Sequence, residues 1–266
     1  MKFRKFTLKH ITLVTVLPAV VVWAVLTALS LGNILDAGYN GIVAIAVLFL
    51  SSMGFRAYHS RFMKRAERKL YEDCDPYPTI DEVKLYLECA GKRVNKSGLT
   101  LTLGMMLALV GDYENAEKAM KSIDVTDSSP LPDGAKAGVY YDLAALYCAM
   151  SLPEHAIECY DIAKQKFMSS SERFKSKLSF DGPTDGEIEC YKGNHETALD
   201  LLNAIDPVNR LQEVTKKFAL AKVHYITGER DTALSEFDWV AKNGGRLAAA
   251  KESAEIVTAV NKLKAE

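Results

Sequence analysis

The sequence lacks the motifs on which most recognisable enzyme chemistry depends. It contains no glycine-rich phosphate-binding loop, no cluster of metal ligands and no nucleophile elbow. We therefore predict no catalytic residue, no metal site and no cofactor, and we expect that the protein is not an enzyme.

The nearest candidates for chemistry have simpler interpretations. His155 and Cys159 are four residues apart on a predicted helix, but their neighbours belong to a helical repeat pattern, which favours packing over a catalytic pair or a metal ligand. For the same reason His224 is assigned to packing, whereas His195 is assigned to a solvated turn. The acidic run at 187–189 is typical of a solvated helix face.

Cysteine is sparse and shows no pairing pattern. The five cysteines are odd in number and widely spaced, and no Cys-x-x-Cys pair suggests zinc binding or thiol exchange. They are typical of reduced, partly buried side chains in a cytosol-facing domain. The five are Cys74, Cys89, Cys148, Cys159 and Cys190.

Acidic residues are almost absent from the first 70 residues. This segment carries ten basic and two acidic side chains, which gives it a net charge of +8. Residues 71–266 carry the other 23 basic and 32 acidic side chains, a net charge of −9. Because the acidic part would repel a phosphate backbone, we expect no nucleic-acid partner. The basic part suits anionic lipid.

Two long apolar runs predict a membrane hairpin. Residues 11–31 carry no charge, and as a helix of about 21 residues they match a hydrocarbon core of about 30 Å. The second run, 38–55, is weaker because its strictly apolar part covers only 42–55. Basic outer flanks and a connecting loop without lysine or arginine place both termini in the cytoplasm. We therefore predict a multi-pass integral protein of the plasma membrane, with the lipid bilayer as a partner and a cytoplasmic repeat domain.

Two features of this segment leave alternatives open. Residues 2–9 resemble the basic region of a cleaved signal peptide, and Ala28-Leu29-Ser30 resembles its cleavage site, although the apolar run is longer than usual and a second one follows. The basic run after Phe55 either lies along the lipid surface or, more simply, continues the second helix.

Prolines mark a domain boundary. Pro76 and Pro78 interrupt the helical pattern, and Thr79 with Glu82 predicts a capping box that restarts it. The predicted organisation is a membrane hairpin with a basic juxtamembrane helix at 1–70, a linker at 71–78 and a helical domain at 79–266.

An internal repeat occupies this helical domain, where strand signals are scarce. Three units share a small residue in a first helix that precedes an alanine in a second helix by twelve positions. A weaker fourth copy contains Ala198, and we expect Gly182-Pro183 and Gly186 to truncate its first helix. The three pairs are Gly104 and Ala116, Ala144 and Ala156, and Ala221 and Ala233.

The small residues and the turns between helices have geometric reasons. A small residue lets two helix backbones approach closely where they cross. Gly111, Gly193 and Gly228 suit a left-handed turn between the paired helices.

These units resemble the tetratricopeptide repeat, with its Leu-Gly-x-x-Tyr, Ala-x-x-x-Phe and Pro pattern, over residues 97–244. The repeat alanines are 40, 42 and 35 residues apart, against about 34 in the family, so we expect inserted loops at 124–134 and 169–186. The resemblance implies an all-α fold in which an α-solenoid of helix pairs ends in a C-terminal capping helix at 246–266.

The resemblance also implies a peptide-binding groove lined by the first helix of each pair. It favours a membrane-tethered adaptor or scaffold that binds an unidentified protein or peptide partner. The alternatives are a self-associating, homo-oligomeric membrane scaffold and a small-ligand sensor. The family positions that grip a terminal carboxylate are not matched, so an apolar or mixed peptide is favoured. The candidate groove residues, for each of which ordinary packing is an equal alternative, are Leu101, Met105, Leu109, Tyr141, Asp142, Ala145, Phe218 and Lys222.

Overall fold

The fold is entirely helical wherever the structure describes it. The computed structural model describes residues 2–31, 40–91, 95–175, 180 and 182–265, and none of these residues forms a strand. The predicted all-α class is therefore confirmed. The chain divides into two compact units, which we describe separately: unit 1 comprises Met1–Ala66 and Lys84–Lys96, and unit 2 comprises Glu67–Val83 and Ser97–Glu266.

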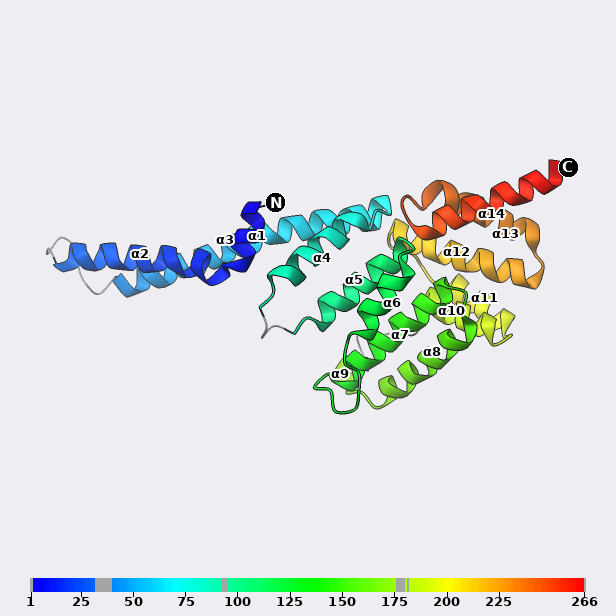
Figure 1. The fold of residues 1–266 in the computed structure, drawn as a ribbon, viewed down its shortest axis with the longest axis horizontal. Helices are drawn as coiled ribbons and strands as arrows, with labels where there is room; N and C mark the ends of the chain where they lie inside the picture. Colours follow the sequence, from blue (N-terminus) through cyan, green and yellow to red (C-terminus); the bar gives the residue numbers. More distant parts are fainter. Residues whose placement is uncertain (1, 32–39, 92–94, 176–179, 181, 266) are drawn as a thin grey trace. The chain divides into compact units, whose positions relative to one another are not determined.

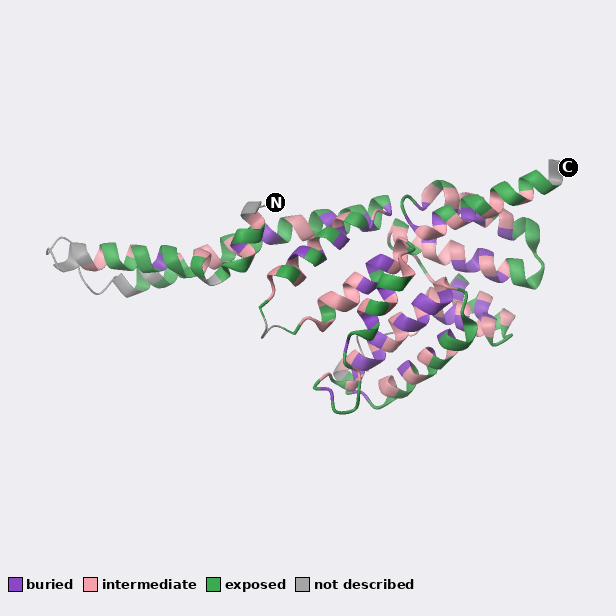
Figure 2. Cartoon of the chain, in the orientation of Figure 1, coloured by how far each residue is buried: buried purple, intermediate pink, exposed green. Residues whose placement is uncertain are grey.

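Unit 1 contains helices α1 (Lys2–Lys9), α2 (Ile11–Leu31) and most of α3 (Asn40–Asp73). Polar contacts join α1 to α3: the Thr7 hydroxyl lies 3.2 Å from Nε2 of His59, and both side chains are buried. The guanidinium of Arg4 lies 3.6 Å from the centre of the Phe62 ring. Large apolar side chains of α2 and of the first part of α3 remain exposed (Figure 2).

The membrane prediction is wrong. Among the residues that the structure describes, no helix is both long enough and apolar enough to cross a bilayer. A span needs about 20 consecutive apolar residues, whereas the apolar run at 42–55 passes directly into the basic part of α3, and the side chains of 28–31 in the first run are not among those described. Spans at 11–31 and 38–55, an integral multi-pass protein and a topology with cytoplasmic termini are all withdrawn. The predicted loop at 32–39 lies outside the described residues.

Helix α3 continues without interruption to Asp73, as the simpler interpretation of the basic run predicted. Helix α4 (Tyr77–Cys89) follows, and it begins two residues before Thr79. The predicted capping box is therefore wrong: the Thr79 hydroxyl is buried inside the helix without a hydrogen-bond partner. The carboxylate of Asp75 instead accepts a hydrogen bond of 3.3 Å from the backbone N–H of Tyr77 at the start of the helix.

In unit 2, consecutive helices pack as pairs joined by short turns (Figure 1). A single-turn helix, α9 (Glu172–Lys175), lies between the second and third pairs, and α14 (Ala248–Ala265) follows the last pair. The pairs are α5 (Ser97–Leu109) with α6 (Tyr113–Lys121), α7 (Asp133–Ala149) with α8 (Pro153–Met168), α10 (Pro183–Tyr191) with α11 (His195–Ala204), and α12 (Arg210–Thr227) with α13 (Arg230–Asn243).

The small residues lie where the helices cross, as the repeat pattern predicted. Each of the four repeat alanines, at 116, 156, 198 and 233, has no exposed surface. A Cβ atom on Gly104 would lie 2.6 Å from Cγ of Met120, so only glycine allows α5 and α6 to approach this closely. Gly111, Gly193 and Gly228 have φ values of 84°, 83° and 90°, which confirms the left-handed turns.

The third helix pair, α10 with α11, is more regular than the sequence suggested. Gly182 and Pro183 start α10 rather than disrupt it, because proline fits the first turn of a helix. Gly186 lies inside α10, twelve positions before Ala198, and a Cβ atom there would lie 2.5 Å from Cγ of Leu202. It therefore occupies the same position as Gly104, Ala144 and Ala221, and α10 is shorter than the other first helices but complete in pattern.

A buried carboxylate holds three of these helices together. Asp185 of α10 is 1% exposed and accepts hydrogen bonds from the hydroxyls of Tyr141 on α7, at 2.7 Å, and Tyr160 on α8. It also accepts one from the backbone N–H of Gly182 at 2.9 Å. Burial, with the adjacent Asp185 carboxylate, raises the pKa of both tyrosines, so their hydroxyls remain protonated donors.

Candidate functional site

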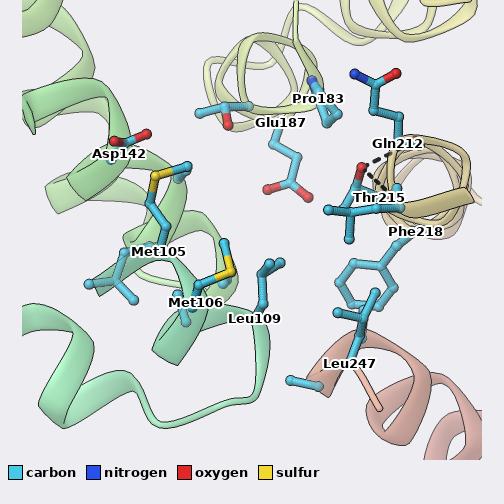
Figure 3. Close-up of a pocket in the computed structure, with 18 of the residues that line it drawn as sticks. Met105, Met106, Leu109, Asp142, Pro183, Glu187, Gln212, Thr215, Phe218 and Leu247 are labelled. Carbon is cyan, nitrogen blue, oxygen red and sulfur yellow. Dashed lines mark hydrogen bonds between the residues drawn. The ribbon is translucent and has the colours of Figure 1, made fainter. Parts of the chain in front are cut away.

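A cavity of about 410 Å³ opens among the helix pairs of unit 2 (Figure 3). Its wall is formed by α5, α7, α10 and α12, which are the first helices of the four pairs, and by α14, with contributions from α6 and the end of α3. Of the second helices, α8, α11 and α13 contribute no described residue to it. The cavity is therefore built from the face that the repeat pattern assigned to a groove.

One sequence position places a side chain on this wall in every pair. The residue directly after the small residue of each first helix lines the cavity. Because the small residue faces the second helix of its own pair, the next residue, about 100° further round the helix, is turned toward the neighbouring first helices. The four residues at this position are Met105, Ala145, Glu187 and Lys222.

Most of the cavity wall is apolar. Figure 3 shows Met105, Met106 and Leu109 on one side and Phe218 on the other, with Glu187 directed into the space between them. The Thr215 hydroxyl, also on the wall, is engaged with its own helix, since it donates to the backbone carbonyls of Leu211 and Gln212. Its hydrogen is therefore already engaged and is not available to donate to a ligand.

A single ion pair crosses the cavity wall. The ammonium of Lys222 lies 3.0 Å from Oε1 of Glu187, and these side chains are 17% and 12% exposed. Lys222 also donates to the carbonyl of Cys148 at 3.3 Å. Burial lowers the pKa of Lys222, but the carboxylate of Glu187 outweighs this effect and leaves the pKa above its ordinary value. Lys222 is therefore protonated at neutral pH.

Two further carboxylates line the cavity without an ion-pair partner. In the part of the chain that the structure describes, neither Asp142 nor Glu252 has a cation within 4.0 Å, and neither carboxylate accepts a hydrogen bond. Burial raises the pKa of Asp142 to about 7. Burial also raises the pKa of Glu252, although Lys222 acts in the opposite direction. The cavity holds three carboxylates and one ammonium, so it is electronegative when they are ionised.

The structure brings six of the eight predicted groove residues to this cavity: Met105, Leu109, Asp142, Ala145, Phe218 and Lys222. It places the other two elsewhere. Leu101 packs against the main hydrophobic core, and Tyr141 is engaged by Asp185 and lies edge-on to Phe180 at 5.2 Å. For these two residues the alternative of ordinary packing describes what the structure shows.

Two charged residues of the cavity, Glu187 and Glu252, were not predicted from the sequence. The assignment of 187–189 to a solvated face is wrong, because Ile188 is fully buried and Glu187 is paired. One signal could have found Glu187: it follows Gly186, which precedes Ala198 by the repeat offset of twelve. Glu252 gives no such signal, since it reaches the cavity only because α14 packs back on the pairs.

The histidine and cysteine residues considered above for catalysis or metal binding do not line the cavity. His155 is exposed and its ring lies 5.3 Å from that of Tyr147. Burial raises the pKa of Cys159 to about 11, so this thiol is protonated at neutral pH and is a poor nucleophile. Nδ1 of His224 lies 2.9 Å from a carboxylate oxygen of Glu236, which can accept a hydrogen bond from it. Within the described residues, no three histidine, cysteine or acidic side chains are grouped to hold a metal ion.

Comparison with models of known protein families, with curated proteins and with solved structures gives no match for this chain. The resemblance to the tetratricopeptide repeat therefore rests on the repeat positions alone.

Proposed function

We propose that unit 2 is an α-solenoid of tetratricopeptide-like helix pairs, and that its cavity binds a peptide segment of a partner protein rather than carrying out catalysis. The observation that carries this proposal is the repeated position after each small residue, which contributes a lining residue from all four first helices. A concave surface built by successive first helices is the feature with which helical-repeat proteins bind extended or helical peptides.

The composition of the cavity supports this proposal. A volume of about 410 Å³ falls within the range of about 300–1,000 Å³ that is usual for ligand sites. Methionine and phenylalanine side chains at its centre provide adaptable apolar contacts, and the few charged groups provide orientation. This arrangement suits an apolar or mixed peptide.

Peptides selected from a random display library on the full chain should bind in the cavity. Met105→Ala or Phe218→Ala should weaken the selected peptides about tenfold or more, because both remove apolar contact area at the cavity wall. Isothermal titration calorimetry measures the change. Met168→Ala is the matched control, since Met168 is 71% exposed on α8 and does not line the cavity.

Equal affinities for the wild-type chain, Met105→Ala and Phe218→Ala would mean that the peptides bind on another face. If Met168→Ala weakened them as strongly as Met105→Ala, the effect would not belong to the cavity.

A second candidate function is self-association through unit 1. Along α2 and the first part of α3, large apolar side chains such as Val21, Trp23, Phe49 and Leu50 are each more than half exposed. An apolar surface of this extent marks an interaction site. The residues at 11–31 and 42–55 carry no charge, so a second copy would bring no like charge against this surface. The occupant that we propose is a second copy of the chain.

Sedimentation of the full chain should therefore show oligomers whose proportion rises with concentration. Val21→Lys should shift the chain toward the monomer by placing a charge within the contact. Leu263→Lys, at an even more exposed apolar residue of α14, should leave the distribution unchanged. A chain that stays monomeric at every concentration, or a monomer that floats with lipid vesicles, would contradict self-association.

A further inference from the structure

The charges that line the cavity do not balance. Glu187 is neutralised by Lys222 at 3.0 Å, but Asp142 on α7 and Glu252 on α14 line the same cavity without a cation of their own among the described residues. Both residues are partly buried, and desolvating a carboxylate that has no partner costs free energy. Unpaired carboxylates of this kind in a cleft indicate a candidate binding site. A ligand that supplies positive charge would remove this cost.

The apolar wall defines the rest of the ligand. Met105, Leu109 and Phe218 line the same cavity as the carboxylates, and their side chains offer no hydrogen bond. A hydrated inorganic cation would gain nothing from them, whereas a lysine or arginine side chain has an apolar stem that packs on such surfaces below its charged group. Apolar neighbours in the same peptide would fill the remaining volume.

We infer that the peptide bound in this cavity presents a lysine or arginine, flanked by apolar side chains, to the carboxylates of Asp142 and Glu252. This inference rests on the proposed peptide-binding function and adds the chemical class of the peptide. Asp142 is the main anionic contact, because Lys222 already lies on the side of Glu252 and partly neutralises its field. Glu252, on α14, adds a second carboxylate to the cavity wall.

The inference also predicts how binding depends on pH. With a pKa raised to about 7 in the free protein, Asp142 is largely neutral below that value and ionised above it. A cation prefers the ionised form, so affinity should rise as the pH increases from about 6 to about 8, while the lysine of the peptide stays protonated. The other titratable groups that line the cavity are Glu187, Lys222, Glu252, Tyr113 and Tyr71.

The test uses the peptides selected on the full chain. They should share a basic residue flanked by apolar ones, and replacing that residue by the uncharged norleucine should weaken binding at pH 8 about tenfold or more. Asp142→Asn should weaken the lysine peptide to a similar extent but leave the norleucine peptide unchanged. The rise of affinity with pH should appear only for the lysine peptide, and Asp142→Asn should reduce it.

A stability measurement separates this role from a structural one. Because the folded-state pKa of Asp142 lies above its unfolded value of about 3.9, ionising it opposes folding as the pH rises from about 4 to about 7. Asp142→Asn should therefore raise the melting temperature of the free protein at pH 8 and change it little at pH 4. A variant that melts lower at pH 8 would show that Asp142 stabilises the fold.

The possible negative results distinguish a wrong peptide class from the absence of peptide binding. Selected peptides that lack a basic residue, bind Asp142→Asn normally and are still weakened by Phe218→Ala would overturn the inference while the peptide-binding function stands. If no peptide binds, both fail. If octylamine binds and no peptide does, the cavity belongs to a small amphiphilic amine, which also overturns the inference.

Discussion

Replacing Asp185 with alanine is expected to lower the free energy of unfolding by about 3 kcal/mol or more, because one buried and two partly buried donors would lose the acceptor that they share. Asp185 accepts from the hydroxyls of Tyr141 and Tyr160 and from the backbone N–H of Gly182, and it is 1% exposed. Alanine supplies no acceptor for these donors. Urea denaturation of the full chain, followed by far-ultraviolet circular dichroism, measures the loss.

Tyr160→Phe is the matched control for this prediction. It keeps the ring and removes one donor together with its need for an acceptor, so its cost should be only about 1–2 kcal/mol. A loss for Asp185→Ala no larger than that for Tyr160→Phe would mean that Asp185 does not join α7, α8 and α10. Asp185→Ala should also weaken peptide binding, because α10 carries Glu187 to the cavity wall.

The helical pairing could be predicted because it depends on positions that repeat along the sequence. A small residue is needed wherever two helix backbones cross closely. Ala116, Ala156 and Ala233 are fully buried at such crossings, and each follows the small residue of its first helix by the same number of positions in the sequence. Helix boundaries were harder to predict. They depend on individual capping contacts, such as the one that Asp75 makes with the start of α4. Several polar residues near a helix end are equally plausible caps, and the sequence does not show which of them is used.

The pair of α10 and α11 shows where prediction from helix propensity fails. Gly186 has a low intrinsic helix propensity, which led us to expect an interrupted helix. In the structure the same glycine is required by the packing of Leu202, which is fully buried. Tertiary packing therefore outweighs propensity at this position, and the repeat offset was the better guide.

The candidate site was predicted in its repeating part only. Met105, Ala145 and Lys222 follow small residues that the sequence pattern had already aligned, so their common face could be inferred. Tyr141 could not be excluded from the groove, because its hydrogen bond to Asp185 joins residues 44 positions apart. Glu252 could not be included, because nothing local specifies how the last helix packs on the pairs.

Breaking the ion pair between Lys222 and Glu187 is the second substitution for which we expect a large loss of stability. Lys222→Met is expected to lower the free energy of unfolding by about 3 kcal/mol, the lower end of the range for breaking a buried pair, because it leaves the partly buried carboxylate of Glu187 without its cation. Methionine keeps the unbranched apolar stem of lysine, so the loss would reflect charge more than packing. Thermal and urea denaturation of the full chain at neutral pH measure it.

The double variant Lys222→Met/Glu187→Leu should recover most of this stability, since replacing both members of a buried pair with apolar residues is often neutral or stabilising. A double variant no more stable than Lys222→Met would contradict the assignment of the loss to an unpaired Glu187. The double variant also separates two roles of charge in the cavity. It removes one positive and one negative group, leaves Asp142 and Glu252 in place, and should therefore still bind the lysine peptide in preference to the norleucine peptide. The ion pair would then serve to hold α10 against α12, and the two unpaired carboxylates would serve to select the ligand.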